Sequence, residues 1–195
     1  MVYHNHKLVF IAVPKCMTTS IHRELRTQEE MDNRHGHKHY TFFDLTEEYS
    51  NKMLSEYTSF TIVRNPYDRI WSAWKHNFLR QQTIEEPNMI ERFQDYIKTD
   101  LLLQFKNDDY DRIHFVPQVD FLYLMRRHKL VDHIFKYETF ANDWLLFREN
   151  HNKKLPEKFV RVNYTAKTDQ DPYDNESREI IKKIYEDDFR LFNYL

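Results

Sequence analysis

A strand-like run that leads directly into a polar helix start is the feature that most constrains the fold of this chain. Residues 7–13, Lys-Leu-Val-Phe-Ile-Ala-Val, form a mostly apolar run with β-branched residues at positions 9, 11 and 13, and the run ends at Pro14. Lys15 follows, and hydroxyl side chains occupy positions 18–20. The first amides of a helix lack backbone partners and attract anions, and Lys15 adds a full positive charge. The segment therefore predicts a phosphate-binding turn at the carboxyl end of a buried strand.

The common nucleotide-binding loop, G-x-x-x-x-G-K-[ST], is absent, and Gly36 is the only glycine among the 195 residues. An ordinary ATPase or GTPase loop is therefore excluded, and a different nucleotide is implied. A helix cap that binds no ligand is the alternative interpretation, because Ser and Thr are common at helix starts.

A second segment favours phosphate binding. Residues 60–63 are β-prone, Pro66 suits the first turn of a helix, and apolar residues follow at helical spacing. Arg64 ends the strand and Ser72 lies about two turns into the helix, so we expect both to reach one phosphate. For Asp68 and Arg69 we favour helix capping and surface pairing.

The remaining pattern alternates strands with helices. We expect strands at 7–13, 59–63, 132–136 and 159–163, and helices at 19–30, 46–57, 66–82, from Pro87 to about 104, 138–150 and 175–188. Such alternation indicates an α/β fold with a parallel sheet covered on both faces.

Several motifs follow one another along the chain in the order in which a known protein family has them. Pro14-Lys-Cys-Met-Thr-Thr-Ser20 is followed by Val63-Arg-Asn-Pro-Tyr-Asp-Arg-Ile-Trp-Ser-Ala73, His114-Phe-Val-Pro-Gln118, Val131–Phe140, Val162–Thr165 and Tyr185–Tyr194. Over nearly its whole length the chain thus resembles the sulfotransferases that use 3′-phosphoadenosine 5′-phosphosulfate (PAPS). It is most similar to the carbohydrate (type 2) branch, which includes the uronyl and heparan 2-O-sulfotransferases and soluble bacterial relatives.

The resemblance implies a single domain, 1–195, with a three-layer αβα architecture, a central parallel sheet and a P-loop NTPase-like sulfotransferase fold. It implies PAPS as co-substrate, and Lys15 stabilising charge on the bridging oxygen as sulfate leaves. The 5′ end would be held by Lys15, Cys16, Met17, Thr18, Thr19 and Ser20. Arg64 and Ser72 would hold the 3′-phosphate, and Asn163 and Thr165 would close over the nucleotide.

One departure from the family pattern lies in the first loop. Met17 and Thr18 stand where the family usually has small residues. A side chain there is expected to crowd the sulfate or to force a different backbone path.

Sulfuryl transfer to a hydroxyl also needs a base. Residues 34–45 contain histidines at alternate positions, and His39 begins a segment that resembles the start of the catalytic segment in uronyl 2-O-sulfotransferases. His39 is therefore the expected base, with His37 as helper and reserve and His35 third. His114 is a competitor for which we favour a structural role. A metal site and an exposed turn are the alternatives for the cluster, but no compact ligand set appears elsewhere, so we expect no metal.

Composition limits the partners. The net charge of −2 and the pI near 6.6 argue against bulk nucleic-acid binding. No apolar run approaches membrane-spanning length, and the single cysteine fits a reducing compartment, so we expect a cytoplasmic protein with no membrane partner. The acceptor is expected to be a carbohydrate or another hydroxyl compound. Aromatic residues at helical spacing, Trp71, Trp74, Phe78 and Tyr96, are expected in the core rather than in a sugar-stacking platform.

Two functions of other classes remain open. A kinase-like phosphotransferase would need a magnesium-binding carboxylate and a glycine-rich loop, and the sequence shows neither clearly. A non-catalytic nucleotide-binding protein would keep Arg64 and Ser72 and would lose nothing when His39 is replaced. Magnesium dependence distinguishes the phosphotransferase from a sulfotransferase, and turnover distinguishes a sulfotransferase from the non-catalytic nucleotide-binding protein.

Overall fold

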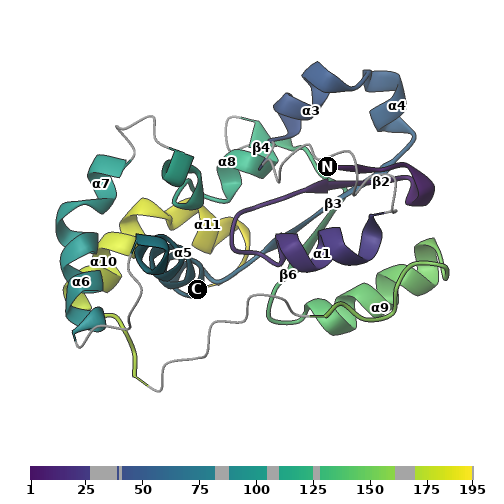
Figure 1. Cartoon of the computed structure of the whole chain (residues 1–195). Coiled ribbons are helices and arrows are strands. Elements are labelled where there is room, and N and C mark those ends of the chain that lie inside the picture. Colours follow the sequence, from purple (N-terminus) through teal and green to yellow (C-terminus); the bar gives the residue numbers. More distant parts are fainter. Residues whose placement is uncertain are drawn as a thin grey trace. The chain divides into compact units, whose positions relative to one another are not determined.

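The computed structural model describes residues 1–26, 39, 41–81, 88–104, 110–124, 128–160 and 170–194 (Figure 1). The chain folds as two compact units. The first comprises Met1–Arg64 and Asp120–Tyr164, and the second comprises Asn65–Val119 and Thr165–Leu195. The expectation of a single sulfotransferase domain over 1–195 stays a prediction.

The first unit contains a sheet and most of the short helices. Its elements are β1 (Val2–Tyr3), η1 (His4–His6), β2 (Leu8–Ile11), α1 (Thr18–Leu25), α3 (Phe42–Glu48), α4 (Asn51–Ser55), β3 (Thr58–Val63), β4 (Tyr123–Leu124), β5 (His128–Lys129), β6 (His133–Lys136) and α9 (Phe140–His151). The short helix α8 (Val119–Leu122) spans the point where the chain enters this unit again.

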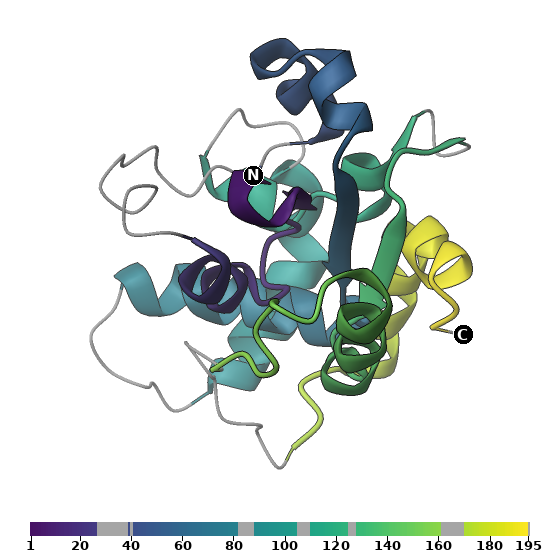
Figure 2. The ribbon, with the colours of Figure 1, turned by 90° about the vertical axis from the view of Figure 1, so that its right-hand side faces the viewer.

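Four strands form the main sheet, in the order β1-β2-β3-β6. β2, β3 and β6 run parallel, with Phe10 opposite Phe60 and Ile62 opposite Phe135, and Figure 2 shows β3 and β6 side by side. The predicted parallel sheet is confirmed for these three strands. β1 runs antiparallel to β2, so this edge makes the sheet as a whole mixed. All four residues of β2 are buried, as a continuous apolar run predicts.

An aromatic cluster joins α9 to the sheet. The Phe60 ring stacks on Phe10 at 4.9 Å between centroids and lies 5.6 Å from Trp144, and Phe135 contacts both Trp144 and Phe147. These contacts place α9 over one face of the sheet, and they account for the burial of the large side chains there.

The amino ends of β3 and β6 are joined by a side chain. Asp132 Oδ2 accepts hydrogen bonds from the Ser59 amide and from the Ser59 hydroxyl, both at 2.7 Å. The Asp132 amide in turn lies 3.0 Å from Ser59 Oγ. This pair fixes the register of the two strands at the end opposite to the loops that follow them.

The second unit is helical where it is described. Its elements are α5 (Pro66–Gln81), α6 (Met89–Thr99), α7 (Leu101–Gln104), η2 (Tyr110–His114), α10 (Asn175–Ile184) and α11 (Glu186–Leu191). Its core includes Trp71, Trp74 and Phe93, with Phe78 and Tyr96 packed against them. The prediction that these aromatic residues belong to the core is therefore confirmed.

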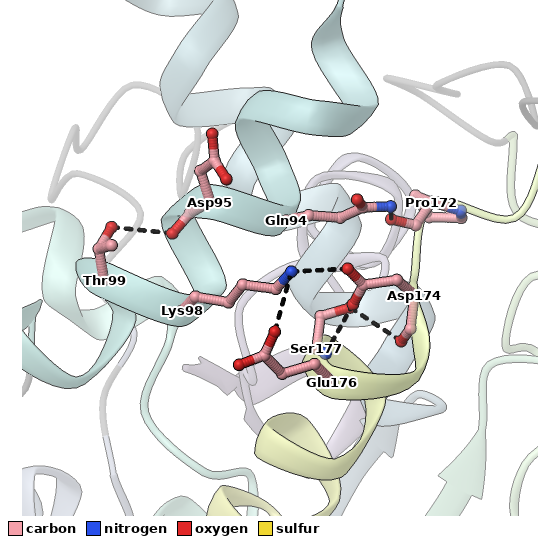
Figure 3. Close-up of polar contacts among 8 residues, drawn as sticks. All are labelled: Gln94, Asp95, Lys98, Thr99, Pro172, Asp174, Glu176 and Ser177. Atoms are coloured by element: carbon pink, nitrogen blue, oxygen red, sulfur yellow. Dashed lines mark hydrogen bonds and ion pairs between the residues drawn. The ribbon is translucent and has the colours of Figure 1, made fainter.

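Helices α6 and α10 lie side by side in this unit, and a charged side chain connects them (Figure 1, Figure 3). Lys98 Nζ lies 2.6 Å from Asp174 Oδ2 and 3.2 Å from Glu176 Oε2. Asp174 also caps α10 by accepting from the Ser177 amide. The hydrogen bond from Lys98 and those from Ser177 lower the pKa of Asp174 to about 2, so the carboxylate stays charged over the ordinary pH range.

Arg69 is not a surface residue, and the prediction of surface pairing is wrong for it. Its side chain is 0% exposed and donates to the carbonyl oxygens of His114 (3.0 Å) and Val116 (2.8 Å). Asp188 is also fully buried and accepts from the amides of Gln118 and Val119, both at 2.9 Å. Burying the guanidinium is tolerable because Nη1 and Nη2 donate to these two carbonyl oxygens, whereas Nε has no hydrogen-bond partner among the described residues. His114 is also buried and contributes its carbonyl oxygen to this network, and its structural role stays a prediction.

Element boundaries differ from expectation in two further places. The helix expected at 46–57 is two helices, because a capping box of Thr41 and Asp44 starts α3 earlier and Ser50 caps α4 anew. Residues 159 and 160 are not in a strand, and 161–163 lie outside the described residues.

Candidate active site

The loop between β2 and α1 has an unusual backbone. Lys15 has φ 66° and Met17 has φ 62°, both in the left-handed region that favours glycine. Met17 is the N-cap residue of α1, and its side chain makes no capping hydrogen bond. The backbone at Met17 thus adopts a conformation that glycine takes without strain, and the expectation that a side chain here crowds the sulfate or forces a different backbone path stays a prediction.

The side chains of this loop divide into buried and exposed ones. Cys16, Thr18 and Ser20 are buried, whereas Thr19 is exposed. The Thr18 hydroxyl donates to the carbonyl oxygen of Val13 at 3.3 Å, so it closes the turn between the strand and α1. The sequence therefore folds here as predicted, with a strand, a tight turn and a helix.

Lys15 and Arg64 meet at the carboxyl ends of the neighbouring parallel strands β2 and β3. Arg64 Nη1 donates to the Lys15 carbonyl oxygen at 3.5 Å. Burial, followed by repulsion from the Arg64 cation, lowers the pKa of Lys15 to about 8. Two positive charges held together and partly away from water form a site that favours an anion.

An aromatic ring supports Arg64. The Arg64 guanidinium carbon lies 4.5 Å from the centroid of the Tyr137 ring. Tyr137 follows β6, and its amide donates to the Val63 carbonyl oxygen at 2.7 Å, one residue before Arg64. The hydrogen bonding between β3 and β6 thus continues up to the position where the side chains of Arg64 and Tyr137 contact each other.

His39 lies at the same strand end. Its Nδ1 is 2.8 Å from the carbonyl oxygen of Ala12, which follows β2 and precedes Lys15 by three residues. A carbonyl oxygen only accepts, so Nδ1 carries the proton and Nε2 carries the lone pair of the neutral ring. That is the tautomer a base requires if it is to take a proton at Nε2.

The other predicted residues are distributed differently. Ser72 is buried in α5 of the second unit, and its pairing with Arg64 at one phosphate stays a prediction. His37, Asn163 and Thr165 lie outside the described residues. The first unit therefore brings together Lys15, Arg64 and His39.

Two contributors were not predicted as site residues. The carbonyl of Ala12 orients His39, and Tyr137 supports Arg64. Every residue has a backbone carbonyl, so the sequence does not indicate which carbonyl will orient a side chain. Tyr137, in contrast, belongs to the Val131–Phe140 segment that matched the family pattern, and its place directly after a strand was a usable signal.

Fold and site together define an α/β protein in which two basic residues, Lys15 and Arg64, and a histidine, His39, lie at one end of the parallel strands. Comparison with protein-family models then matches residues 1–195 to the sulfotransferase family. The chain belongs to this family, the type 2 sulfotransferases, which are transferases of the sulfuryl group. A search of curated proteins and a search of solved structures each found no match.

Among the described residues, no helix has the length and apolar character that crossing a membrane requires. In the same part of the chain, no three His, Cys, Asp or Glu side chains are grouped so that they would hold a metal ion.

Proposed function

We propose that this protein transfers the sulfuryl group of PAPS to a hydroxyl of a carbohydrate acceptor. The observation that carries the proposal is the meeting of Lys15, Arg64 and His39 at one end of the parallel strands. Lys15 and Arg64 supply positive charge for a polyanionic donor, and His39 supplies a nitrogen base for a neutral acceptor. The type 2 resemblance supports the carbohydrate class.

In the proposed reaction His39 Nε2 accepts the proton of the acceptor hydroxyl as its oxygen attacks sulfur. The new bond joins the acceptor oxygen to sulfur, and the bond between sulfur and the bridging phosphate oxygen breaks. Lys15 stabilises the charge that develops on that leaving oxygen, and adenosine 3′,5′-bisphosphate is released. The hydrogen bond from Nδ1 to the Ala12 carbonyl is kept throughout, and it also favours the imidazolium formed.

The remaining predicted residues have roles around this centre. Backbone amides of residues 16–20 hold the 5′ end, together with the side chains of Thr19 and Ser20. Arg64 holds the 3′-phosphate, with Ser72 from α5, and Asn163 and Thr165 close over the nucleotide. In-line transfer depends on alignment of donor and acceptor, so much of the rate enhancement comes from positioning.

Calorimetric titration with adenosine 3′,5′-bisphosphate in the absence of magnesium tests the donor site. We expect binding by the wild type and a loss of about ten- to a hundredfold in Arg64→Ala, the range for a hydrogen-bonded charged partner. Arg23→Ala is the matched control, because Arg23 is an exposed arginine of α1 in the same unit. Absence of binding by the wild type overturns the proposal.

Turnover tests the chemistry. Incubation with PAPS and a panel of neutral and uronic-acid oligosaccharides should yield a product heavier by one sulfuryl group, detected by mass spectrometry. Binding of the bisphosphate without any product from hydroxyl acceptors would instead identify a non-catalytic nucleotide-binding protein.

A further inference from the structure

Arg64 is partly buried, and an aromatic ring contacts its guanidinium group. The Tyr137 ring contacts the face of the group, with 4.5 Å between the guanidinium carbon and the ring centroid. A cation–π contact through the face takes up none of the five N–H donors, which lie in the guanidinium plane.

Both partners are fixed by backbone contacts. Arg64 follows Val63, the last residue of β3, and the Val63 carbonyl accepts from the Tyr137 amide at 2.7 Å. Tyr137 itself follows Lys136, the last residue of β6. The ring therefore lies at the carboxyl end of the β3–β6 pairing, and the hydrogen bond from the Tyr137 amide to Val63 holds its backbone there.

A second contact, a hydrogen bond, also orients the guanidinium group. Arg64 Nη1 donates to the carbonyl oxygen of Lys15, in the loop before α1. Together, the ring on one face of the plane and the carbonyl at one edge restrict the rotation of a side chain that would otherwise have several rotamers. Ordering such a side chain in advance lowers the cost of ordering it when a ligand binds.

From this arrangement we infer that Tyr137 is a positioning residue that holds the guanidinium of Arg64 in its phosphate-binding orientation, through a contact that uses none of its N–H donors. The inference rests on the proposed function, in which Arg64 holds the 3′-phosphate of the donor. It assigns Tyr137 a role in discriminating nucleotides that carry a 3′-phosphate from those that lack it.

Binding of two probes separates this role from a structural one. The probes are adenosine 3′,5′-bisphosphate and adenosine 5′-monophosphate, which differ by the 3′-phosphate. In Tyr137→Leu we expect a roughly three- to tenfold loss of affinity for the bisphosphate, as a cation–π contact predicts, and unchanged affinity for the monophosphate. Tyr137→Phe keeps the ring and should bind both probes as the wild type does.

A double-mutant cycle completes the experiment. In an Arg64→Ala background, Tyr137→Leu should cause no further loss, because the residue it positions is already gone. If Tyr137→Leu does not fold, Tyr137→Gln replaces it, with the same expected result.

Three outcomes overturn the inference. They are unchanged bisphosphate affinity in the non-aromatic variants, an equal loss for both probes, and an additive loss in the Arg64→Ala background. In each of these cases binding by the wild type leaves the proposed function standing. Failure of the wild type to bind the bisphosphate overturns both the proposed function and this inference. That result is therefore distinguished from the three outcomes above.

Discussion

His39 Nδ1 lies 2.8 Å from the carbonyl oxygen of Ala12, so the backbone of one loop sets the tautomer of a histidine from another part of the sequence. The residues are 27 positions apart, and the strand β2 ends directly before Ala12. The carbonyl therefore both places the ring and determines which nitrogen can take a proton.

His39→Asn separates these two roles. The side-chain amide nitrogen of the asparagine would occupy a place close to that of Nδ1 and could keep the hydrogen bond to Ala12, whereas the lone pair of Nε2 is lost. We expect kcat to fall by about 10²- to 10⁴-fold, the usual contribution of a general base, with unchanged affinity for adenosine 3′,5′-bisphosphate. Steady-state kinetics and calorimetry measure the two quantities.

His37→Ala is the matched control for that experiment. If it abolishes turnover while His39→Asn leaves turnover intact, His37 is the base and the assignment of His39 is wrong. A loss of nucleotide binding in His39→Asn would point to damage of the loop around Ala12 instead.

The lowered pKa of Lys15 predicts a specific pH dependence of nucleotide binding. In the free protein Lys15 loses its proton near pH 8, and a bound anion raises its pKa because it favours the ammonium form. Affinity should therefore be full below pH 8 and should fall by up to tenfold per pH unit above it. Near this pH, binding takes up a proton, which calorimetry in buffers of different ionisation enthalpy detects.

Lys15→Arg and Cys16→Ser are the controls for this titration. Arginine keeps its charge throughout the range, so the affinity of Lys15→Arg should be independent of pH between about 8 and 10. Cys16→Ser removes the neighbouring thiol, whose electrostatic interaction raises the pKa of Lys15, so the fall in affinity should begin at a lower pH than in the wild type. A wild-type profile that is flat across this range contradicts the assignment of Lys15 to the anion site.

Met17→Gly should stabilise the protein. A non-glycine residue in the left-handed region costs about 1 kcal/mol, and Met17 has φ 62°. We expect a gain of about 1 kcal/mol in the free energy of unfolding, measured by urea denaturation. Met17→Ala is the control, since it removes the long side chain but keeps Cβ, and it should show no such gain. A loss of stability in Met17→Gly would mean that the Met17 side chain contributes more than the backbone strain costs.

Arg69 should prove important for stability rather than for chemistry. Arg69→Met removes the donors to the carbonyls of His114 and Val116 and leaves these acceptors unsatisfied. We expect a loss of about 3 kcal/mol in the free energy of unfolding. The control Arg190→Met breaks an exposed ion pair with Asp187 and should cost less than about 1 kcal/mol. Equal losses in the two variants would contradict the buried network.

Local patterns predicted much of this structure, and the failures have physical causes. β2, α1, β3 and α5 were predicted close to their observed positions, because apolar runs, Pro14 and Pro66 act within a few residues. The two-residue strand β1 is too short for any periodicity, so the mixed edge of the sheet could not be foreseen. The early start of α3 could have been, since Thr41 and Asp44 form a capping box that the sequence displays.

The site residues divide in the same way, into those that a local pattern predicts and those that depend on distant contacts. Lys15 and Arg64 were predicted to bind anions because each follows a strand, and parallel strands bring such residues to one edge. Arg69 was misjudged because its partners, His114 and Val116, lie 45 and 47 residues further along the chain, and no local pattern reports them. The burial of an arginine depends on tertiary contacts that composition and spacing do not encode.

The place of β3 in the sheet has a consequence for how the chain folds during synthesis. β3 lies between β2 and β6, and its pairing with β6 joins Ser59 to Asp132, which is made 73 residues later. Until then one edge of β3, with Phe60 and Ile62, has no partner strand, and an open apolar edge favours aggregation. A chain truncated before β6 should aggregate during translation in vitro, whereas the full chain should remain dispersed, as sedimentation of the products would show. The nascent protein is therefore most vulnerable while the ribosome translates the long segment between β3 and β6.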